Sequence, residues 1–349
     1  MNPATVQLES VLWSSNHGLV ALANAADAEG AKASEAARGA SEADSAAAAV
    51  CGFEDVLRPD LSVPDLAGAA VSKGNFVLKL QRRNASESGM HVVGDENVHQ
   101  AENEIDIMRH LDAEPSKCKF IVEFLFGTCT PQVSYIGMEH CRGGDLFSLL
   151  ASCDSLLIGD VIHYAVEIAI GIQYLHDRNI IHADLKPENI GLTASGHVRL
   201  LDFGLSVLLD EERDRNPENG RLEVVTSSGT IFYSAPEILR RECHGIETDW
   251  WSYGVLIFEM LFGSWPWDGV DAQETCNLIC CTPLPSPQDL GAEALDADWD
   301  LIEKLLVKPR SERLGYNKGL EDIKTHALFA SVDWDLAARE GYLAPFSLQ

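Results

Sequence analysis

The stretch from His182 to Asn189 concentrates the residue types that phosphoryl transfer needs. Transfer of a γ-phosphoryl group to a hydroxyl requires a carboxylate that orients the hydroxyl and accepts its proton, a cation on the moving phosphate, and an oxygen ligand for Mg²⁺. Asp184, Lys186 and Asn189 offer these three groups within one loop. An Asp-Phe-Gly triplet after the next apolar strand adds Asp202 as a second carboxylate for a metal. The tandem motifs predict a phosphotransferase.

The elements around these motifs divide into a strand-rich part and a helical part. Three short apolar segments are predicted to be strands: 76–80, 121–126 and 135–138. A helix is predicted between residues 98 and 111. Beyond Gly143 the pattern becomes mainly helical. The clearest helical segments there are 161–175, 250–262 and 301–307. This order predicts an α+β fold of two lobes.

The balance of charge is strongly acidic. The 349 residues include 54 acidic and 26 basic side chains, which gives a formal net charge of −28. Such a surface repels phosphate backbones and anionic lipids, so no nucleic acid or membrane partner is expected and basic partners are favoured. Nine cysteines occur in no regular framework, and neither a signal peptide nor a long apolar run is evident. A cytoplasmic or nuclear location is therefore expected.

The first fifty residues differ in composition from the rest. Residues 20–50 are rich in alanine, acidic residues, glycine and serine, and they lack aromatic and large aliphatic residues after Leu22. Because little apolar surface can be buried there, residues 1–50 are expected to be a disordered tail, with a partner-binding arm as the alternative. Residues 51–141 are then expected to form the strand-rich lobe and a hinge, and residues 142–349 the helical lobe.

From about residue 53 onward the chain resembles the protein kinase family, through the catalytic-loop stretch, the Asp-Phe-Gly triplet and the Ala-Pro-Glu triplet at 235–237. The resemblance implies the two-lobed kinase fold, ATP and Mg²⁺ as cofactors, and a protein substrate. It assigns catalysis to two residues and metal binding to two others: Asp184 and Lys186, and Asn189 and Asp202. Asn189 is expected to contribute to the nucleotide site as well.

The resemblance also assigns nucleotide-binding residues to the first lobe and the hinge. Lys79 stands where the family has its phosphate-pairing lysine, and Glu104 on the following helix would be its ion-pair partner. Met138 is similar to the family's gatekeeper residue. Glu139 and Cys141 fall in the hinge whose backbone groups bind adenine.

Further matches imply structural roles and a group within the family. Arg313 would be the buried partner of Glu237, and Asp249 would brace the catalytic loop. A regulatory column of side chains is implied by four residues: Met108, Phe124, His182 and Phe203. The C-terminal motifs Thr325–Phe329, Asp333-Trp334 and Ala344–Phe346 are similar to those of the AGC group, which includes the cyclic-nucleotide-dependent kinases.

Three departures from the family pattern are expected to matter. Between residues 53 and 76 there is no Gly-x-Gly-x-x-Gly loop, and Gly68 is left as a partial substitute. Val77 stands where the family has alanine above adenine, and Gly191 where it has leucine below, so a nucleotide site displaced toward the helical lobe is hypothesised. Ala183 replaces the arginine before the catalytic aspartate.

Three classes of function remain open from the sequence. The first is an active kinase acting on serine or threonine, the branch of the family that Lys186 and Thr230 mark. The second is a pseudokinase scaffold that binds a partner without turnover, which the altered glycine loop and adenine site favour. A small-molecule phosphotransferase shares the catalytic residues, but it is expected to lack the Ala-Pro-Glu triplet and the helix starting at Asp249-Trp250-Trp251, both of which are present.

Three acidic residues predict a substrate with basic residues before the phosphoacceptor. Asp145, Glu188 and Glu259 match three positions at which the AGC group binds arginines on the N-terminal side of the phosphoacceptor. Converging carboxylates suit the bidentate geometry of arginine better than lysine. A plain surface role is the alternative for each residue taken alone.

Activity is expected not to depend on phosphorylation of the activation segment, which is the stretch between Asp202 and Glu237. Thr226 lies where the AGC group carries its activating phosphothreonine, and such a phosphate orders the segment by pairing with cations. Three positions that would supply those cations carry other residues: Gln100, Ala183 and Val207. The insert at 210–220 is acidic, and its neighbouring arginines are expected to be solvated. Constitutive activity or ordering by an activating partner is therefore predicted.

Overall fold

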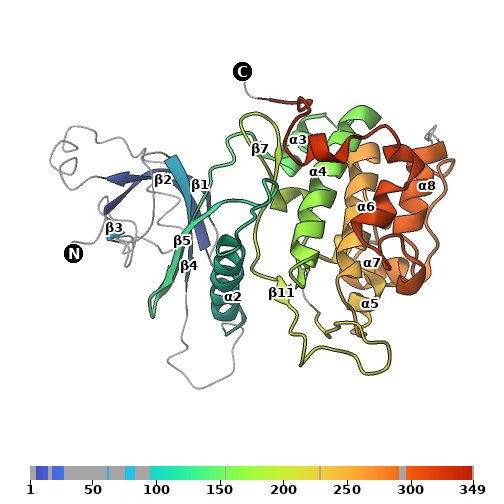
Figure 1. Cartoon of the computed structure of the whole chain (residues 1–349), viewed down its shortest axis with the longest axis horizontal. Helices are drawn as coiled ribbons and strands as arrows, with labels where there is room; N and C mark the ends of the chain where they lie inside the picture. Colours follow the sequence, from blue (N-terminus) through green and yellow to red (C-terminus); the bar gives the residue numbers. More distant parts are fainter. Residues whose placement is uncertain are drawn as a thin grey trace. The chain divides into compact units, whose positions relative to one another are not determined.

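The computed structural model describes residues 5–14, 18–26, 61–62, 75–82, 95–153, 155–227, 229–290 and 296–347. The chain folds as two units (Figure 1): an N-terminal unit of residues 1–115 and 122–140, and a C-terminal unit of residues 116–121 and 141–349. Among the helices in the described ranges, none is long and apolar enough to cross a membrane.

The N-terminal unit is built on an antiparallel six-stranded sheet in the order β3-β1-β2-β4-β6-β5. Its strands are β1 (Thr5–Ser14), β2 (Gly18–Ala26), β3 (Leu61–Ser62), β4 (Asn75–Arg82), β5 (Phe124–Cys129) and β6 (Val133–Met138). Helix α2 (Asp95–Asp112) packs against β4, β5 and β6. It buries Ile105, Met108 and Leu111 at helical spacing, as the apolar pattern predicts.

The first two strands correct the prediction of a tail over residues 1–50. Thr5–Ser14 and Gly18–Ala26 form a hairpin whose second strand pairs with β4, with Val20 opposite Lys79. Leu19, Ala21 and Ala23 alternate along β2 and are fully buried. In β2, Ala21 and Ala23, which contributed to the prediction of disorder, belong to a period-2 pattern of buried residues on one sheet face. Residues 27–50 lie outside the described ranges.

The boundary between the units also differs from the prediction. Residues 116–121 belong to the C-terminal unit, because the carbonyl of Phe120 accepts a hydrogen bond from the Leu200 N–H at 2.8 Å and Ile121 bridges to Leu200. Phe120 is fully buried there. The strand predicted at 121–126 therefore begins later, at Phe124.

The C-terminal unit is mainly helical. Its α-helices are α3 (Leu146–Cys153), α4 (Ile158–His176), α5 (Pro236–Leu239), α6 (Glu247–Phe262), α7 (Ala272–Cys281), α8 (Asp296–Leu305), α9 (Leu320–Lys324) and α10 (Trp334–Ala337). Short 3₁₀ turns cover Pro187–Asn189, Ile231–Tyr233, Arg310–Glu312 and Ala327–Phe329. Helices α4, α6 and α8 confirm the three helical segments predicted beyond Gly143.

Helices α4 and α6 form the core of this unit, and they pack on each other. The side chains of Trp250, Trp251 and Tyr253 on α6 are fully buried. Gly254 allows α8 to approach, because a Cβ there would lie 2.8 Å from the Cβ of Leu305. Burial on nearly every face explains why α6 is mainly apolar from Trp250 to Phe262.

Short strands frame the segment that carries the chemistry. Strand β8 (Ile180–Ile181) pairs with β11 (Val207–Leu208), and β9 (Ile190–Leu192) pairs with β10 (Val198–Leu200) and β7 (Gly144–Asp145). The catalytic-loop stretch runs from β8 to β9, and the Asp-Phe-Gly triplet follows β10. The fold thus fixes both motifs at strand ends.

Candidate active site

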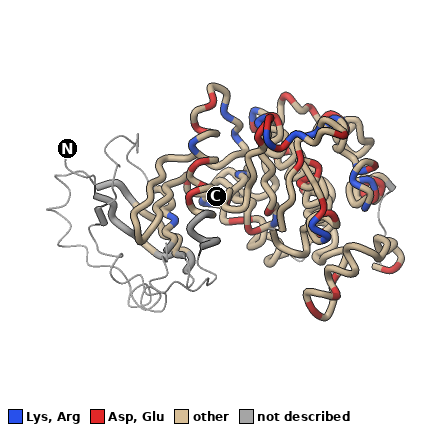
Figure 2. The backbone as a smooth tube through the Cα atoms, turned by 90° about the horizontal axis from the view of Figure 1, so that it is seen from below, with Lys and Arg blue, Asp and Glu red and all other residues tan. Residues whose placement is uncertain are grey.

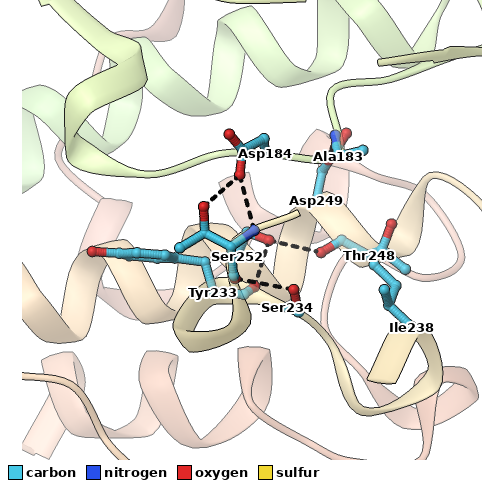
Figure 3. A pocket seen from close by; sticks show the side chains of 9 residues that line it. Ala183, Asp184, Tyr233, Ser234, Ile238, Thr248, Asp249 and Ser252 are labelled. Carbon is cyan, nitrogen blue, oxygen red and sulfur yellow. Dashed lines mark hydrogen bonds between the residues drawn. The ribbon is translucent and has the colours of Figure 1, made fainter. Parts of the chain in front are cut away.

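Asp184 accepts hydrogen bonds from several neighbouring groups, and it lines the pocket drawn in Figure 3. Its Oδ1 accepts the N–H and the hydroxyl of Thr230, at 3.0 and 2.8 Å. Its Oδ2 accepts Lys186 Nζ at 2.7 Å and Asn189 Nδ2 at 3.0 Å. Lys186 also donates to the Thr230 hydroxyl at 2.9 Å. The structure therefore brings together the three residues predicted from the loop, and Thr230, which the sequence also singled out, binds both Asp184 and Lys186.

Asp249 at the start of α6 holds the backbone of the catalytic loop. Its carboxylate accepts the N–H groups of His182 and Ala183 at 2.9 and 3.0 Å, and His176 Nε2 lies 2.8 Å away. Burial alone raises the pKa of Asp249, but hydrogen bonds and positive charge from His176 and His182 hold this pKa below its usual value. Ala183 adopts a left-handed φ of 66°, which these bonds stabilise against its steric cost.

His182 connects the catalytic loop to the Asp-Phe-Gly segment. Its ring lies 5.4 Å from the ring of Phe203, and its Nε2 is 3.0 Å from the carbonyl of Leu201. Ser206 donates to the His182 carbonyl at 2.9 Å. Asp202 adopts a φ of 58°, and its Oδ1 accepts the Gly204 N–H at 3.3 Å. These contacts give the metal-binding candidate Asp202 a fixed backbone relation to the loop of Asp184.

The oxygen atoms of Asn189 and Asp202 are suitable ligands for a hard divalent cation. Asn189 commits its amide nitrogen to the carbonyl and carboxylate of Asp184, at 2.8 and 3.0 Å. Its amide oxygen is therefore the atom that it offers to a cation, and Asp202 supplies a carboxylate. Amide and carboxylate oxygens are ligands that Mg²⁺ prefers.

In the N-terminal unit, Lys79 and Glu104 form a close ion pair. Lys79 Nζ lies 2.8 and 3.0 Å from the two carboxylate oxygens of Glu104, which is fully buried on α2. Met138 ends β6 and is buried, and the Glu139 N–H donates to the Glu123 carbonyl at 3.0 Å. The predicted pair and the predicted strand before the hinge are thus in place.

Gly191 does not leave the space that its small size suggests. A Cβ at Gly191 would lie 2.7 Å from the Sγ of Cys141 and 2.9 Å from a methyl group of Leu201. These two side chains occupy the volume beside Gly191 within the C-terminal unit. The bulk expected to be lost by glycine is therefore supplied by Cys141 and Leu201.

The β1–β2 hairpin reveals residues that the sequence reasoning missed. The stretch Trp13-Ser14-Ser15-Asn16-His17-Gly18-Leu19-Val20 joins the two strands and matches Gly-x-Gly-x-x-Gly-x-Val at its last glycine and its valine. Trp13 and Ser15 replace the first two glycines. Because β2 pairs directly with β4 across a long intervening segment, the connection between β1 and β2 is a candidate for the glycine-rich loop that residues 53–76 lack. Gly68 lies outside the described residues.

The three acids predicted to bind substrate differ in their surroundings. Asp145 accepts the Ser148 N–H at 2.7 Å at the start of α3, while Glu188 is exposed. Glu259 accepts the hydroxyl of Tyr233 at 2.6 Å. Burial raises the pKa of Glu259 to about 7; the hydrogen bond opposes the shift, and the negative charge of Glu188 adds to it. Acidic residues are spread widely over the described C-terminal unit (Figure 2).

The activation segment is anchored more firmly than predicted. Arg310 pairs with Glu223 and Glu247 at 2.7 Å each, and Arg221 lies 3.9 Å above the ring of Tyr316. The expectation that Arg221 is solvated is wrong, because it also contacts Glu247 at 3.4 Å. Two other arginines pair with neighbouring acids on the insert: Arg213 with Asp214, and Arg215 with Glu211.

Thr226 has a partner that the sequence did not suggest. Its hydroxyl lies 3.0 Å from Nε2 of His244, a buried residue beyond α5. His244 Nδ1 lies 2.9 Å from the Glu242 carbonyl, which makes Nδ1 the protonated nitrogen and leaves Nε2 to accept from Thr226 in the neutral ring. Only the fold brings residues 226 and 244 together, through an antiparallel bridge between Val224 and His244.

The geometry defines a phosphotransferase site on a two-lobed α+β fold, and comparison with known proteins identifies the family. The model of the protein kinase domain matches residues 72–329. Mouse ribosomal protein S6 kinase alpha-6 is 39% identical over 228 residues, covering 65% of this chain and 28% of the mouse protein. Chicken ribosomal protein S6 kinase 2 alpha is 39% identical over 229 residues, covering 65% and 29%.

The chain belongs to the protein kinase family. It is a serine/threonine protein kinase of the AGC group, as the motifs predict. The chain spans less than a third of the length of the mouse and chicken relatives, at 28% and 29%.

Proposed function

We propose that this kinase transfers the γ-phosphoryl group of Mg·ATP to serine or threonine in proteins that carry arginine before the acceptor. The observation that supports this most directly is Asp184, whose two oxygens are held by Lys186, Asn189 and Thr230 in a loop braced by Asp249. Each of these residues is intact in this chain.

Asp184 is proposed to orient the acceptor hydroxyl and take its proton. Two hydrogen bonds on each carboxylate oxygen fill its lone-pair positions, so an incoming hydroxyl must replace one donor. The Thr230 hydroxyl is the donor most like the acceptor, because both are hydroxyl groups. If the acceptor hydroxyl replaces it on Asp184, the Thr230 N–H still holds the carboxylate. Lys186 then remains beside the acceptor as the cation that neutralises the moving phosphate.

Nucleotide and metal binding are proposed residue by residue from the matches to the kinase family. Lys79, oriented by the buried Glu104, is proposed to pair with the phosphates, and backbone groups near Glu139 and Cys141 to bind adenine. Asn189 and Asp202 would hold Mg²⁺, which when bound neutralises phosphate charge. The hypothesis of an adenine displaced toward the C-terminal unit stays a prediction.

The substrate preference is proposed to depend on Glu188 and Glu259, with Asp145 as a third contact. Glu188 is exposed, and the nearby carboxyl group of Glu259 is about half ionised near pH 7. A bound guanidinium group would relieve the repulsion between these two acids, which favours arginine in the substrate. A degenerate peptide library tests this specificity. Arginine two and three residues before the acceptor is expected, and a preference for acidic residues or for proline after the acceptor would contradict it.

Binding of such a substrate should depend on pH through Glu259. Its carboxyl group has a pKa of about 7, so the ionised form that attracts arginine grows from about a tenth to about nine tenths between pH 6 and pH 8. The KM for an arginine-containing peptide is expected to fall by up to about tenfold over this range. Glu259→Gln should remove this pH dependence. Identical KM profiles for the two proteins would exclude Glu259 from substrate binding.

Phosphorylation of Thr226 is expected to change activity little. The Thr226 hydroxyl contacts His244, and the positions Gln100, Ala183 and Val207 supply no cation to a phosphate. We expect Thr226→Ala to keep kcat/KM within about threefold of the unphosphorylated wild type, in an assay of both proteins on one peptide. A gain of a hundredfold on phosphorylating Thr226, about 2.7 kcal/mol in barrier terms, would contradict the proposal.

A scaffold without turnover is the second candidate, and one observation favours it. Trp13 and Ser15 stand where two glycines would let the backbone approach the phosphates. Thermal stabilisation by Mg·ATP without autophosphorylation would support the scaffold. The cytoplasmic location and an activating partner stay predictions.

A further inference from the structure

Three metal-ligating side chains meet in the C-terminal unit outside the catalytic loop. His163 and Glu167 lie one turn apart on α4, and His197 lies just before β10. One ligand atom from each falls within 4.8 Å of the other two. Glu167 Oε1 is 3.4 Å from His163 Nε2 and 2.7 Å from His197 Nδ1. Two ligands at i and i+4 on one helix face with a third from a separate element is a common arrangement in zinc sites.

The hydrogen bonds of this cluster leave one atom unexplained. Glu167 Oε2 accepts the Val198 N–H at 2.8 Å, and Oε1 is the partner of His197 Nδ1. His163 Nε2, by contrast, is buried and has no hydrogen-bond partner within the described part of the chain. Buried polar atoms in native proteins are generally satisfied, so this nitrogen requires a partner that the protein itself does not supply.

The chemistry of the nitrogen suits a cation. Burial, together with the neighbouring His197, lowers the pKa of His163 to about 4, so its ring is neutral at physiological pH. A neutral imidazole nitrogen without a proton is the form that ligates metals. Burial also raises the pKa of Glu167, and a cation would offset the cost of its buried charge.

We propose that His163, Glu167 and His197 bind one Zn²⁺ ion. Two imidazole nitrogens and one carboxylate oxygen form a ligand set that favours zinc over Mg²⁺ or Ca²⁺. The Glu167 and His197 ligand atoms would separate from 2.7 Å to about 3.3 Å, the spacing that tetrahedral bonds of about 2.0–2.1 Å require. The ion replaces the direct hydrogen bond between them, while the Val198 N–H continues to hold Oε2.

A cavity beside the cluster provides entry and a fourth ligand position. The cavity has a volume of about 350 Å³, and both His163 and Glu167 line it. Asp160 on the same helix adds a negative charge to its wall, and Val332 and Tyr342 from the C-terminal segment also line it. The space is ample for a water molecule on the ion. The zinc would tie α4 to the turn between β9 and β10.

The experiment uses the full chain, stripped of metal by a chelator and titrated with Zn²⁺ by calorimetry in excess Mg²⁺. Wild type is expected to bind one zinc ion and to gain thermal stability. His163→Phe should bind it at least tenfold more weakly, without that gain. This variant removes the one ligand that makes no hydrogen bond in the cluster, so the apo protein should keep its fold. His163→Leu serves as a second variant, and His110→Phe on exposed α2 surface as the control that binds like wild type.

Cobalt distinguishes this site from the cysteines of the chain. Co²⁺ in wild type should give visible bands of tetrahedral coordination without thiolate charge-transfer bands, and these bands should be lost in His163→Phe. Equal zinc affinity in wild type and His163→Phe, thiolate bands at one equivalent, or absence of binding would each overturn the proposal.

Discussion

Asp184→Asn is expected to lower kcat for phosphoryl transfer by about 10²–10⁴-fold while leaving the affinity for Mg·ATP nearly unchanged. The amide cannot take the proton of the acceptor hydroxyl. Its NH₂ group would also face donors from Lys186, Asn189 or Thr230 that the carboxylate accepts in the wild type. Turnover is measured on a serine peptide and binding by thermal shift with Mg·ATP. Asp289→Asn, an exposed acid near α7, serves as the matched control.

The two readouts separate the possible results of this experiment. Loss of turnover with retained binding fits a residue that acts on the acceptor rather than on the nucleotide. Wild-type turnover in Asp184→Asn would show that the catalytic loop has been wrongly assigned. Equal losses in Asp184→Asn and Asp289→Asn would point to a general defect in folding.

Arg313→Ala should destabilise the C-terminal unit by about 3–5 kcal/mol. Arg313 binds both carboxylate oxygens of Glu237, at 2.6 and 3.0 Å, and donates to the Glu247 carbonyl at 3.1 Å. Both charges are almost fully buried, with 2% and 3% of Arg313 and Glu237 exposed. Removal of the arginine leaves a buried carboxylate without its cation. Urea denaturation gives the change in the free energy of unfolding.

Two further variants make the stability prediction specific. Lys324→Ala breaks a surface pair with Glu321 on α9, and it should cost at most about 0.5 kcal/mol. Replacing both members of the buried pair, in Arg313→Met with Glu237→Gln, should recover part of the loss, because no buried charge remains. A cost for Arg313→Ala below about 1 kcal/mol would mean that Glu237 finds another partner or becomes protonated.

Local patterns predicted the features that depend on local sequence. Helices α4 and α6 follow from long apolar periodicity, and Asp184, Lys186 and Asn189 are close in space because they are close in the chain. The β1–β2 hairpin was missed because an alanine-rich composition hid the alternation of Leu19, Ala21 and Ala23. The pairing of β2 with β4 was not predictable either, because about fifty residues separate the two strands and such a pairing leaves no local pattern in the sequence.

Other features required the fold itself. His244 beside Thr226 and Cys141 beside Gly191 are contacts between segments far apart in sequence. The raised pKa of Glu259 depends on burial and on its distance to Glu188, neither of which a motif encodes. The sequence thus predicted which residues are candidates for the chemistry, whereas their spatial neighbours and the pKa of Glu259 followed from the structure.

The central claim, that this chain is an active serine/threonine kinase, is tested most directly by incorporation of the γ-phosphate of ATP into a peptide with one serine after two arginines. A second peptide carrying tyrosine in place of that serine is the control. Rapid labelling of the serine peptide and little labelling of the tyrosine peptide are expected. No labelling of either peptide by a protein that still binds Mg·ATP would contradict the account and favour a scaffold.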